Sequence, residues 1–469
     1  MDENDENGNY CSSSNDTDLM MILSDDHLLS ILVLLPVESI LSFAMTCKRN
    51  FLRCNNHNYG LWKSICIRDW GHSTVDAIVN SNPRFVDWHR VYRRLRNLDQ
   101  VSCFNITTNS NSSSSSSFGP TPRASHSLNF IKGCLLLFAG GSDGGRHLDD
   151  TWIGYIGNNT TTRMINWQRV ISDGPSGRFG HSCVVIGDSL VLFGGINDSG
   201  IRQNDTWIAH AMIDDANTRT FSWRLLDVGP IAPPTRGAHA CCSIDSQKML
   251  IHGGIGLSGV RLGDTWVLSL SENLCFGTWH QTVSQHHHPV PSPRSGHTLT
   301  YIGGSTTILF GGRGTGYEVL NDVWCFDSSQ RGHLGWVPLV FELENISGGG
   351  GLSLARVGHS ATLTLGGRVL IYGGEDSLRH RKNDFWLLDI NSSSRQSSMN
   401  QNQRRVLWRR LKCVDGGYQP RSRSFHRACT DESGRYLYVF GGMVDGVLQP
   451  AEPSGLRFDG ELFVVELVL

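Results

Sequence analysis

The sequence predicts a mainly β protein built from six repeated units, with a small α-helical segment ahead of them. Three features recur in phase along residues 122–469: an Arg-x-x-His tetrad, an apolar run that ends in two glycines, and an Asp-x-Trp motif. Glycine accounts for 52 of the 469 residues, which indicates many turns. Six copies of a short-stranded unit arranged around an axis are typical of a β-propeller.

The charge balance argues against a bulk polyanion as partner. Lys and Arg total 41 against 43 Asp and Glu, so we expect no nucleic acid and no membrane surface as a binding partner. The chain has no apolar run of about 18 residues, and its first residues are acidic, so we expect a soluble intracellular protein in the nucleus or cytoplasm. Thirteen scattered cysteines without a Cys-x-x-Cys pair are interpreted as reduced thiols.

The N-terminal part divides into four segments. Residues 1–22 are acidic and rich in Ser and Asn, and they are predicted to be disordered. Residues 23–70 carry apolar side chains at helical spacing and are expected to form two or three short helices, the first capped by Ser24 and ended by Pro36. Residues 71–104 are predicted to be a helical linker with a possible closing strand, and residues 105–121 a Ser-rich loop.

The segment over residues 23–70 resembles the F-box. The Leu-Leu-x-Ile-Leu run at 28–32, the Ile-Leu pair at 40–41, the Cys-Lys-Arg turn at 47–49 and Leu61-Trp62 carry this resemblance. It implies helix-in-groove docking on a Skp-type adaptor, and through that adaptor an assembly with cullin and RING subunits of a ubiquitin ligase. The side chains expected to bind the adaptor are Leu28, Leu29, Ile31, Leu32, Leu35, Pro36, Ile40, Leu41, Leu61 and Trp62. The alternative is an amphipathic helical cap that packs on the repeats.

Each repeated unit is predicted to contain four strands. The first follows the Arg-x-x-His tetrad, the second runs into the two glycines, the third surrounds Asp-x-Trp, and the fourth contains a second tryptophan. The glycines are expected where the chain needs positive φ and where a Cβ has no room. The tetrads begin at Arg123, Arg178, Arg236, Arg294, Arg356 and Arg423, and the glycine pairs begin at Gly140, Gly194, Gly253, Gly311, Gly373 and Gly441.

These in-phase motifs resemble the kelch repeat, which implies a six-bladed propeller over 122–469. The last unit has Glu461-Leu462-Phe463 in place of Asp-x-Trp, and the sequence printed here has no fourth strand after it. We therefore expect residues 101–106 to supply the outer strand of the sixth blade and to close the ring, which would cover an exposed sheet edge.

The F-box followed by kelch repeats looks most like the corresponding part of the plant blue-light-receptor F-box family. That family carries a flavin-binding LOV domain ahead of its F-box, whereas only 22 residues precede the F-box here, so no flavin or light role is expected. The resemblance implies a substrate-recognition subunit of an SCF-type ubiquitin ligase. In this interpretation the F-box binds the adaptor, the propeller recruits an unknown protein for ubiquitination, and catalysis belongs to other subunits.

Two other classes of function remain open: a plain interaction scaffold, and a kelch enzyme with a metal in the propeller. Six of the 19 histidines belong to the tetrads, where structural packing explains them better than metal ligation. The run at 286–288 is interpreted as a solvated loop. No Gly-x-Ser-x-Gly motif stands at a strand-to-helix turn, and no cysteine has an evident catalytic setting. We expect no catalytic residue, no metal and no cofactor.

Basic side chains recur in the loops between each glycine pair and the following Asp-x-Trp motif. The candidates for substrate binding are Arg146, Arg202, Arg261, Arg313, Arg379 and Arg381. A basic rim of this kind would select an acidic or phosphorylated segment through bidentate contacts. The alternative is that these arginines pair with nearby acidic groups or are simply solvated.

Overall fold

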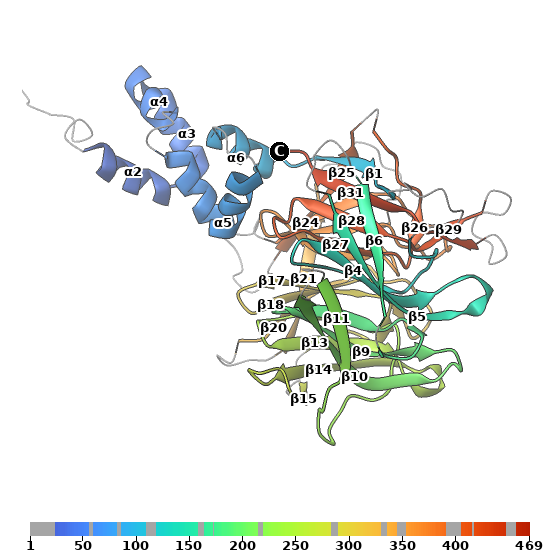
Figure 1. Ribbon diagram of the computed structural model, residues 1–469. Helices are drawn as coiled ribbons and strands as arrows, with labels where there is room; N and C mark the ends of the chain where they lie inside the picture. The colour runs from blue at the N-terminus through green and yellow to red at the C-terminus, as the bar shows by residue number, and fades with distance from the viewer. Residues whose placement is uncertain are drawn as a thin grey trace, which may run out of the picture. The chain divides into compact units, whose positions relative to one another are not determined.

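The computed structural model describes residues 24–55, 60–81, 86–108, 119–157, 164–171, 173–213, 219–282, 289–329, 335–344, 353–390, 405–414, 417–446 and 456–469. The chain divides into two compact units, Met1–Arg96 and Asn97–Leu469 (Figure 1). The N-terminal segment 1–22, which the sequence predicts to be disordered, lies outside the described residues.

The first unit is helical in its described part. Its helices are α2 (Asp25–Leu34), α3 (Val37–Thr46), α4 (Lys48–Asn55), α5 (Leu61–Ser81) and α6 (Trp88–Arg96). Ser24 caps α2 as predicted, because its Oγ accepts a hydrogen bond of 3.3 Å from the backbone N–H of His27. Pro36 precedes α3, and Gly71 kinks α5 at a φ of 83°. None of the helices that the structure describes is long and apolar enough to span a membrane.

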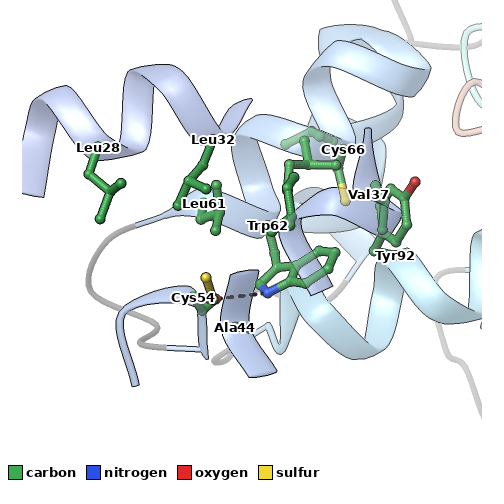
Figure 2. Close-up of a cluster of buried hydrophobic side chains, with 12 residues drawn as sticks. Leu28, Leu32, Val37, Ala44, Cys54, Leu61, Trp62, Cys66 and Tyr92 are labelled. Atoms are coloured by element: carbon green, nitrogen blue, oxygen red, sulfur yellow. Dashed lines mark hydrogen bonds between the residues drawn. The ribbon is translucent and has the colours of Figure 1, made fainter. Parts of the chain in front are cut away.

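The helices of the first unit share one apolar core (Figure 2). Figure 2 shows Leu28 and Leu32 of α2 together with Trp62 of α5 in this cluster. The Trp62 indole Nε1–H donates a 2.9 Å hydrogen bond to the carbonyl oxygen of Cys54, which joins α5 to α4. Arg68 of α5 donates to the carbonyl oxygens of Val33 and Leu35, so it satisfies the C-terminal end of α2. The unit therefore has its own core and caps.

The second unit is a six-bladed propeller, and each blade is a four-stranded antiparallel sheet. The first three blades are β3 (Ser127–Ile131), β4 (Cys134–Gly141), β5 (His147–Ile156) and β6 (Met164–Val170); β8 (Ser182–Ile186), β9 (Ser189–Asn197), β10 (Arg202–Ile213) and β11 (Arg219–Leu225); and β12 (Ala240–Ser243), β13 (Lys248–Ile255), β14 (Arg261–Leu270) and β15 (Gly277–Thr282). The first strand of each blade contacts the first strand of the next, and β27 contacts β3, so these inner strands surround the axis.

The other three blades follow the same order. They are β17 (Thr298–Gly303), β18 (Thr306–Phe310), β20 (Val323–Asp327) and β21 (Gly335–Leu343); β22 (Ser360–Thr364), β23 (Arg368–Tyr372), β24 (Phe385–Asp389) and β25 (Arg405–Cys413); and β27 (Arg427–Thr430), β28 (Tyr436–Phe440), β31 (Leu462–Leu467) and β1 (Gln100–Asn105). Short elements lie between them: β7 (Arg178–Phe179), β16 (Arg294–Ser295), β19 (Arg313–Gly314), β26 (Arg423–Ser424), β29 (Met443–Asp445), β30 (Leu456–Phe458), and the 3-10 turns η2 (Asp143–Gly145) and η3 (Leu257–Gly259).

One segment from the start of the propeller joins three blades. β1 pairs antiparallel with β31, with Val101 opposite Leu467 and Asn105 opposite Phe463, so residues 101–105 form the outer strand of the sixth blade. The start of β1 also pairs in parallel with β25 of the fifth blade; the two labels stand side by side in Figure 1. β2 (Thr107–Thr108) pairs in parallel with β6 of the first blade. The expected loop over 105–121 thus begins with a short strand, formed by two β-branched residues.

An ion pair between a buried arginine and a partly exposed aspartate fixes the same corner in the first five blades. The tetrad arginine of each blade is essentially unexposed and donates two hydrogen bonds of 2.6–3.3 Å to the aspartate of its Asp-x-Trp motif. The tryptophan two residues later donates its Nε1–H to the same carboxylate at 2.6–2.7 Å. In the sixth blade Glu461 accepts from Arg423 at 2.8 Å, so it replaces the missing aspartate.

The glycine pairs lie where neighbouring blades approach most closely. A Cβ on Gly253 of the third blade would lie 2.7 Å from the carbonyl oxygen of Arg294 in the fourth blade, and φ of Gly253 is +64°. In the first blade, Ala139-Gly140 takes the place that a glycine pair has in the other blades. Ala139 has a positive φ of 59°, and its carbonyl oxygen accepts a hydrogen bond from the tetrad arginine Arg123. The predicted pair Gly140-Gly141 is therefore one residue too late, because Ala139 stands where the other blades have their first glycine.

Candidate functional surfaces

The apolar side chains of the helical unit separate into a core set and a surface set. Five of the residues predicted to bind the adaptor are at most 7% exposed: Leu28, Leu32, Ile40, Leu61 and Trp62. They belong to the shared apolar core, so the structure places them inside the helical unit and not on its surface. Helical periodicity selects these residues because a helix face that packs in the core and a helix face that binds a partner are both apolar, and periodicity does not distinguish them.

Exposed apolar side chains lie on α2 and α3, and others lie on α4 (Phe51 and Leu52) and α5 (Val79). Leu34 is 81% exposed and Met45 is 80% exposed, while Ile31 and Leu41 are 42% and 44% exposed. Pro36 is also exposed, and Leu29 and Leu35 are partly buried. We call Ile31, Leu34, Leu41 and Met45 the apolar docking surface. Sequence reasoning missed Leu34 and Met45. Both are apolar residues outside the helical stripe that faces the core, and this position could have marked them as exposed.

The basic candidates of the propeller lie in the connection between the second and third strands of their blades or, for Arg202 and Arg261, at the first residue of the third strand. Because each of these loops connects the same two strands, all of them open on one face of the ring. Arg146 and Arg379 are exposed, and Arg202 and Arg261 are partly buried. The Arg261 guanidinium lies 4.5 Å from the centre of the Tyr317 ring. In the described part of the chain, none of these four arginines has a carboxylate within ion-pair distance.

Two of the predicted arginines are neutralised by carboxylates of the propeller itself. Arg313 lies 2.9 Å from Glu375, and Arg381 lies 2.6 Å from Asp445 and 3.6 Å from Glu375. Burial raises the pKa of Glu375, and the charges of Arg313 and Arg381 act in the opposite direction. For Arg313 and Arg381 the structure thus agrees with the alternative that these arginines pair with nearby acidic groups. Their charges are therefore less available to a binding partner.

The unpaired arginines stand next to exposed apolar side chains. Ile201, Val260 and Leu378 each directly precede one of them, in the pairs Ile201-Arg202, Val260-Arg261 and Leu378-Arg379, and they are 57%, 61% and 73% exposed. We call these six residues the propeller rim. Sequence reasoning found the arginines and missed the apolar residues, which repeat at the same position relative to the arginine.

The histidines of the tetrads do not form a metal site in the part of the propeller that is described. No group of three or more His, Cys, Asp or Glu side chains there could hold a metal ion. All six histidines are buried, and burial reinforced by neighbouring positive groups lowers their pKa well below the ordinary value. The histidine run at 286–288 lies outside the described residues. Twelve cysteines among them are free thiols.

The geometry of the repeats defines a kelch-type propeller, here together with a helical unit that exposes apolar side chains. The family described as the KLHDC2/KLHL20/DRC7 Kelch-repeats domain matches residues 91–273 and 180–355. An F-box/kelch-repeat protein of Arabidopsis thaliana is 51% identical over 100% of this chain and 96% of its own length. The chain belongs to the plant F-box/kelch-repeat proteins.

More distant relatives share only part of their length with this chain. Adagio-like protein 1 of Oryza sativa subsp. japonica is 28% identical over 83% of this chain and 59% of its own length. Adagio protein 3 of Arabidopsis thaliana is 27% identical over 84% of this chain and 60% of its own length. The similarity to these proteins therefore covers about three fifths of their chains.

Proposed function

We propose that this protein is a substrate receptor of an SCF-type ubiquitin ligase. The observation that carries the proposal is the apolar docking surface: Leu34 and Met45 are about four fifths exposed on a helical unit whose own core is complete without them. Large apolar side chains left on a surface favour a protein partner. For an F-box the expected partner is a Skp-type adaptor, which joins the receptor to cullin and RING subunits. The receptor itself carries out no catalysis, and the propeller recruits the protein to be ubiquitinated.

Replacing Leu34 and Met45 together by glutamate is expected to weaken adaptor binding at least tenfold. The double variant Leu34→Glu/Met45→Glu places two charges where apolar area would be buried, while each site alone should change the free energy of unfolding by less than about 0.5 kcal/mol, because both side chains are exposed. Binding is measured by co-purification and by calorimetry of the full chain with a Skp-type adaptor.

The matched control is Val79→Glu, which introduces the same charge at an exposed apolar position of α5. It should bind the adaptor like the wild type. A folded wild-type chain that does not bind the adaptor would contradict the receptor function and favour the scaffold. Equal binding by the double variant would place the docking surface elsewhere.

We further propose that the propeller rim selects the substrate. Arg202, Arg261 and Arg379 offer charge without a local carboxylate, and Ile201, Val260 and Leu378 offer apolar area beside it. A charge-assisted hydrogen bond contributes about 1.5–3 kcal/mol, and each 1.4 kcal/mol is roughly tenfold in affinity. This combination suits an acidic or phosphorylated segment that also carries apolar side chains.

Charge reversal at Arg202 and Arg261 is expected to abolish capture of such segments with the fold intact. The measurement is binding of the full chain to an array of acidic and phosphorylated peptides, compared between Arg202→Glu/Arg261→Glu and the wild type. Arg410→Glu is the matched control, because Arg410 is exposed on the outer strand β25, away from the loops of the rim. Peptide binding that is unchanged in the double variant would remove the rim from the proposal and leave adaptor docking untouched.

A further inference from the structure

One inner-strand position distinguishes the sixth blade from the other five. The residue after each tetrad histidine is small and uncharged in five blades and an arginine in the sixth: Ser127, Ser182, Ala240, Thr298, Ser360 and Arg427. Because the inner strands surround the axis, Arg427 brings a guanidinium to the inner wall of the ring. Its Nε donates a 2.8 Å hydrogen bond to the carbonyl oxygen of His126, across the junction between the sixth and first blades.

A closed collar of backbone hydrogen bonds lies next to this arginine. The residue before each tetrad histidine donates its N–H to the carbonyl oxygen of its counterpart in the preceding blade, and the six bonds of 2.6–2.9 Å complete the circle. The collar consists of Ser125, Gly180, Ala238, Gly296, Gly358 and Phe425, all at positive φ. Phe425, a bulky residue at φ 55°, is two positions from Arg427. The collar therefore holds the start of β27 in a fixed place.

The charge of Arg427 is felt by tetrad histidines of several blades. It lowers the pKa of tetrad histidines in five of the six blades, always after the larger effect of burial. It also acts on Cys241 of the third blade, where burial raises the thiol pKa to about 11 and the arginine opposes that rise. In a ring of six, the third blade stands opposite the sixth. The hydrogen bond to His126 places the guanidinium beside the inner strands at the junction of the sixth and first blades.

This cation has no counter-charge among the residues that the structure describes. The six tetrad arginines each pair with a carboxylate, whereas no carboxylate lies within ion-pair distance of Arg427. The surrounding histidines are held neutral, and burial lowers the pKa of Arg427 itself. Arg427 as a whole residue is nevertheless only partly buried. A partly buried cation without a counter-charge favours the binding of an anion from solution.

A second polar group beside Arg427 also lacks a partner. In the third, fifth and sixth blades the histidine Nε2 bonds to the hydroxyl that follows the tetrad of the preceding blade, at 2.6–3.0 Å. For His126 that position is occupied by Arg427, and both ring nitrogens of His126 are buried without a hydrogen-bond partner in the described structure. His126 is 0% exposed.

We propose that Arg427 is the centre of an oxyanion-binding site at the inner strands of the sixth and first blades, beside the collar and His126. The guanidinium offers the paired N–H donors that match two oxygens of a phosphate or carboxylate group. The occupant is a small oxyanion, either free in solution or carried as the acidic group of a bound chain. This site stands independently of adaptor docking and of the rim.

The test is calorimetric titration of the full chain, in chloride buffer at constant ionic strength, with inorganic phosphate and with N-acetyl-phosphoserine amide. We expect saturable one-to-one binding of at least one probe, weakened at least tenfold in Arg427→Ser. Serine occupies the equivalent position in three other blades, so this substitution fits the fold. Arg421→Ser, an exposed arginine just before β26 of the same blade, should bind like the wild type.

Binding of phosphate alone, or of both probes, supports a free-ion site, and binding of phosphoserine amide alone supports a site for an acidic group on a chain. Binding of neither probe to the wild type overturns the proposal, as does undiminished binding by Arg427→Ser. Thermal unfolding gives a second readout: phosphate should raise the melting temperature of the wild type and of Arg421→Ser, but not that of Arg427→Ser. If Arg427→Ser does not fold, Arg427→Lys, which keeps the charge and loses the paired donors, carries the comparison.

Discussion

Acidification from pH 7 to pH 5.5 is expected to reduce the free energy of unfolding of the propeller by several kcal/mol. The six tetrad histidines and His252 are buried, and burial lowers their pKa, for His252 to about 3. The unfolded chain takes up these protons near pH 6.5 and the folded chain does not, so the stabilisation is complete above that value and is lost as pH falls.

The expected size follows from the proton count. Each such group costs about 1.4 kcal/mol per pH unit once the pH lies below the unfolded pKa, and seven together remove roughly 9 kcal/mol between pH 7 and pH 5.5. That is comparable with the whole stability of a typical domain, about 5–15 kcal/mol. The measurement is urea unfolding followed by tryptophan fluorescence at closely spaced pH values.

Replacing one buried histidine by a neutral residue measures its contribution to the pH dependence of stability. His181→Gln removes a ring whose two nitrogens have no hydrogen-bond partner in the described structure, so it should flatten the slope of stability against pH by about one proton. Val191→Ala is the control, since it removes buried methyl groups from β9 and contains no titratable group. Equal stability of the wild type at pH 7 and pH 5.5 would contradict buried neutral histidines.

The propeller could be predicted because each blade repeats a complete set of local signals. The apolar run, the positive-φ glycines and the tryptophans recur at fixed spacing, and each signal needs only its own blade to be interpreted. The pairing of residues 101–105 with β31 could be predicted because the sixth repeat lacks its own fourth strand. The parallel pairings of β1 with β25 and of β2 with β6 do not follow from any motif, because they depend on how a non-repeating segment crosses the blade junctions.

The candidate surfaces could be predicted only in part, because the sequence does not distinguish a side chain that packs inside a unit from one that faces a partner. Ile31 and Leu32 are adjacent and equally apolar, yet Leu32 is buried and Ile31 is 42% exposed. The ion pair of Arg313 with Glu375 joins residues 62 positions apart, in neighbouring blades. Such a contact becomes visible only when the register of both blades is known.

Arg123→Ala is expected to lower the free energy of unfolding by about 3–5 kcal/mol, because it leaves the largely buried carboxylate of Asp150 without its charged partner. Arg123 is 0% exposed and donates to both oxygens of Asp150, at 2.6 and 2.9 Å, and also to the carbonyl oxygen of Ala139. Burial alone would raise the pKa of Asp150, but the hydrogen bonds and charge of Arg123 outweigh it and lower that pKa. Urea unfolding at pH 7.5 measures the loss.

The energetic role of this pair is tested by a double-mutant cycle with Asp150→Ala. If the cost of Arg123→Ala comes from the uncompensated carboxylate, removing both charges should cost less than the two single changes together, by more than about 1 kcal/mol. Arg146→Ala in the same blade is the control and should stay within about 0.5 kcal/mol of the wild type, since Arg146 is exposed. Strict additivity would mean that Arg123 stabilises the blade through its contacts with backbone carbonyls, and the carboxylate would then be a minor partner.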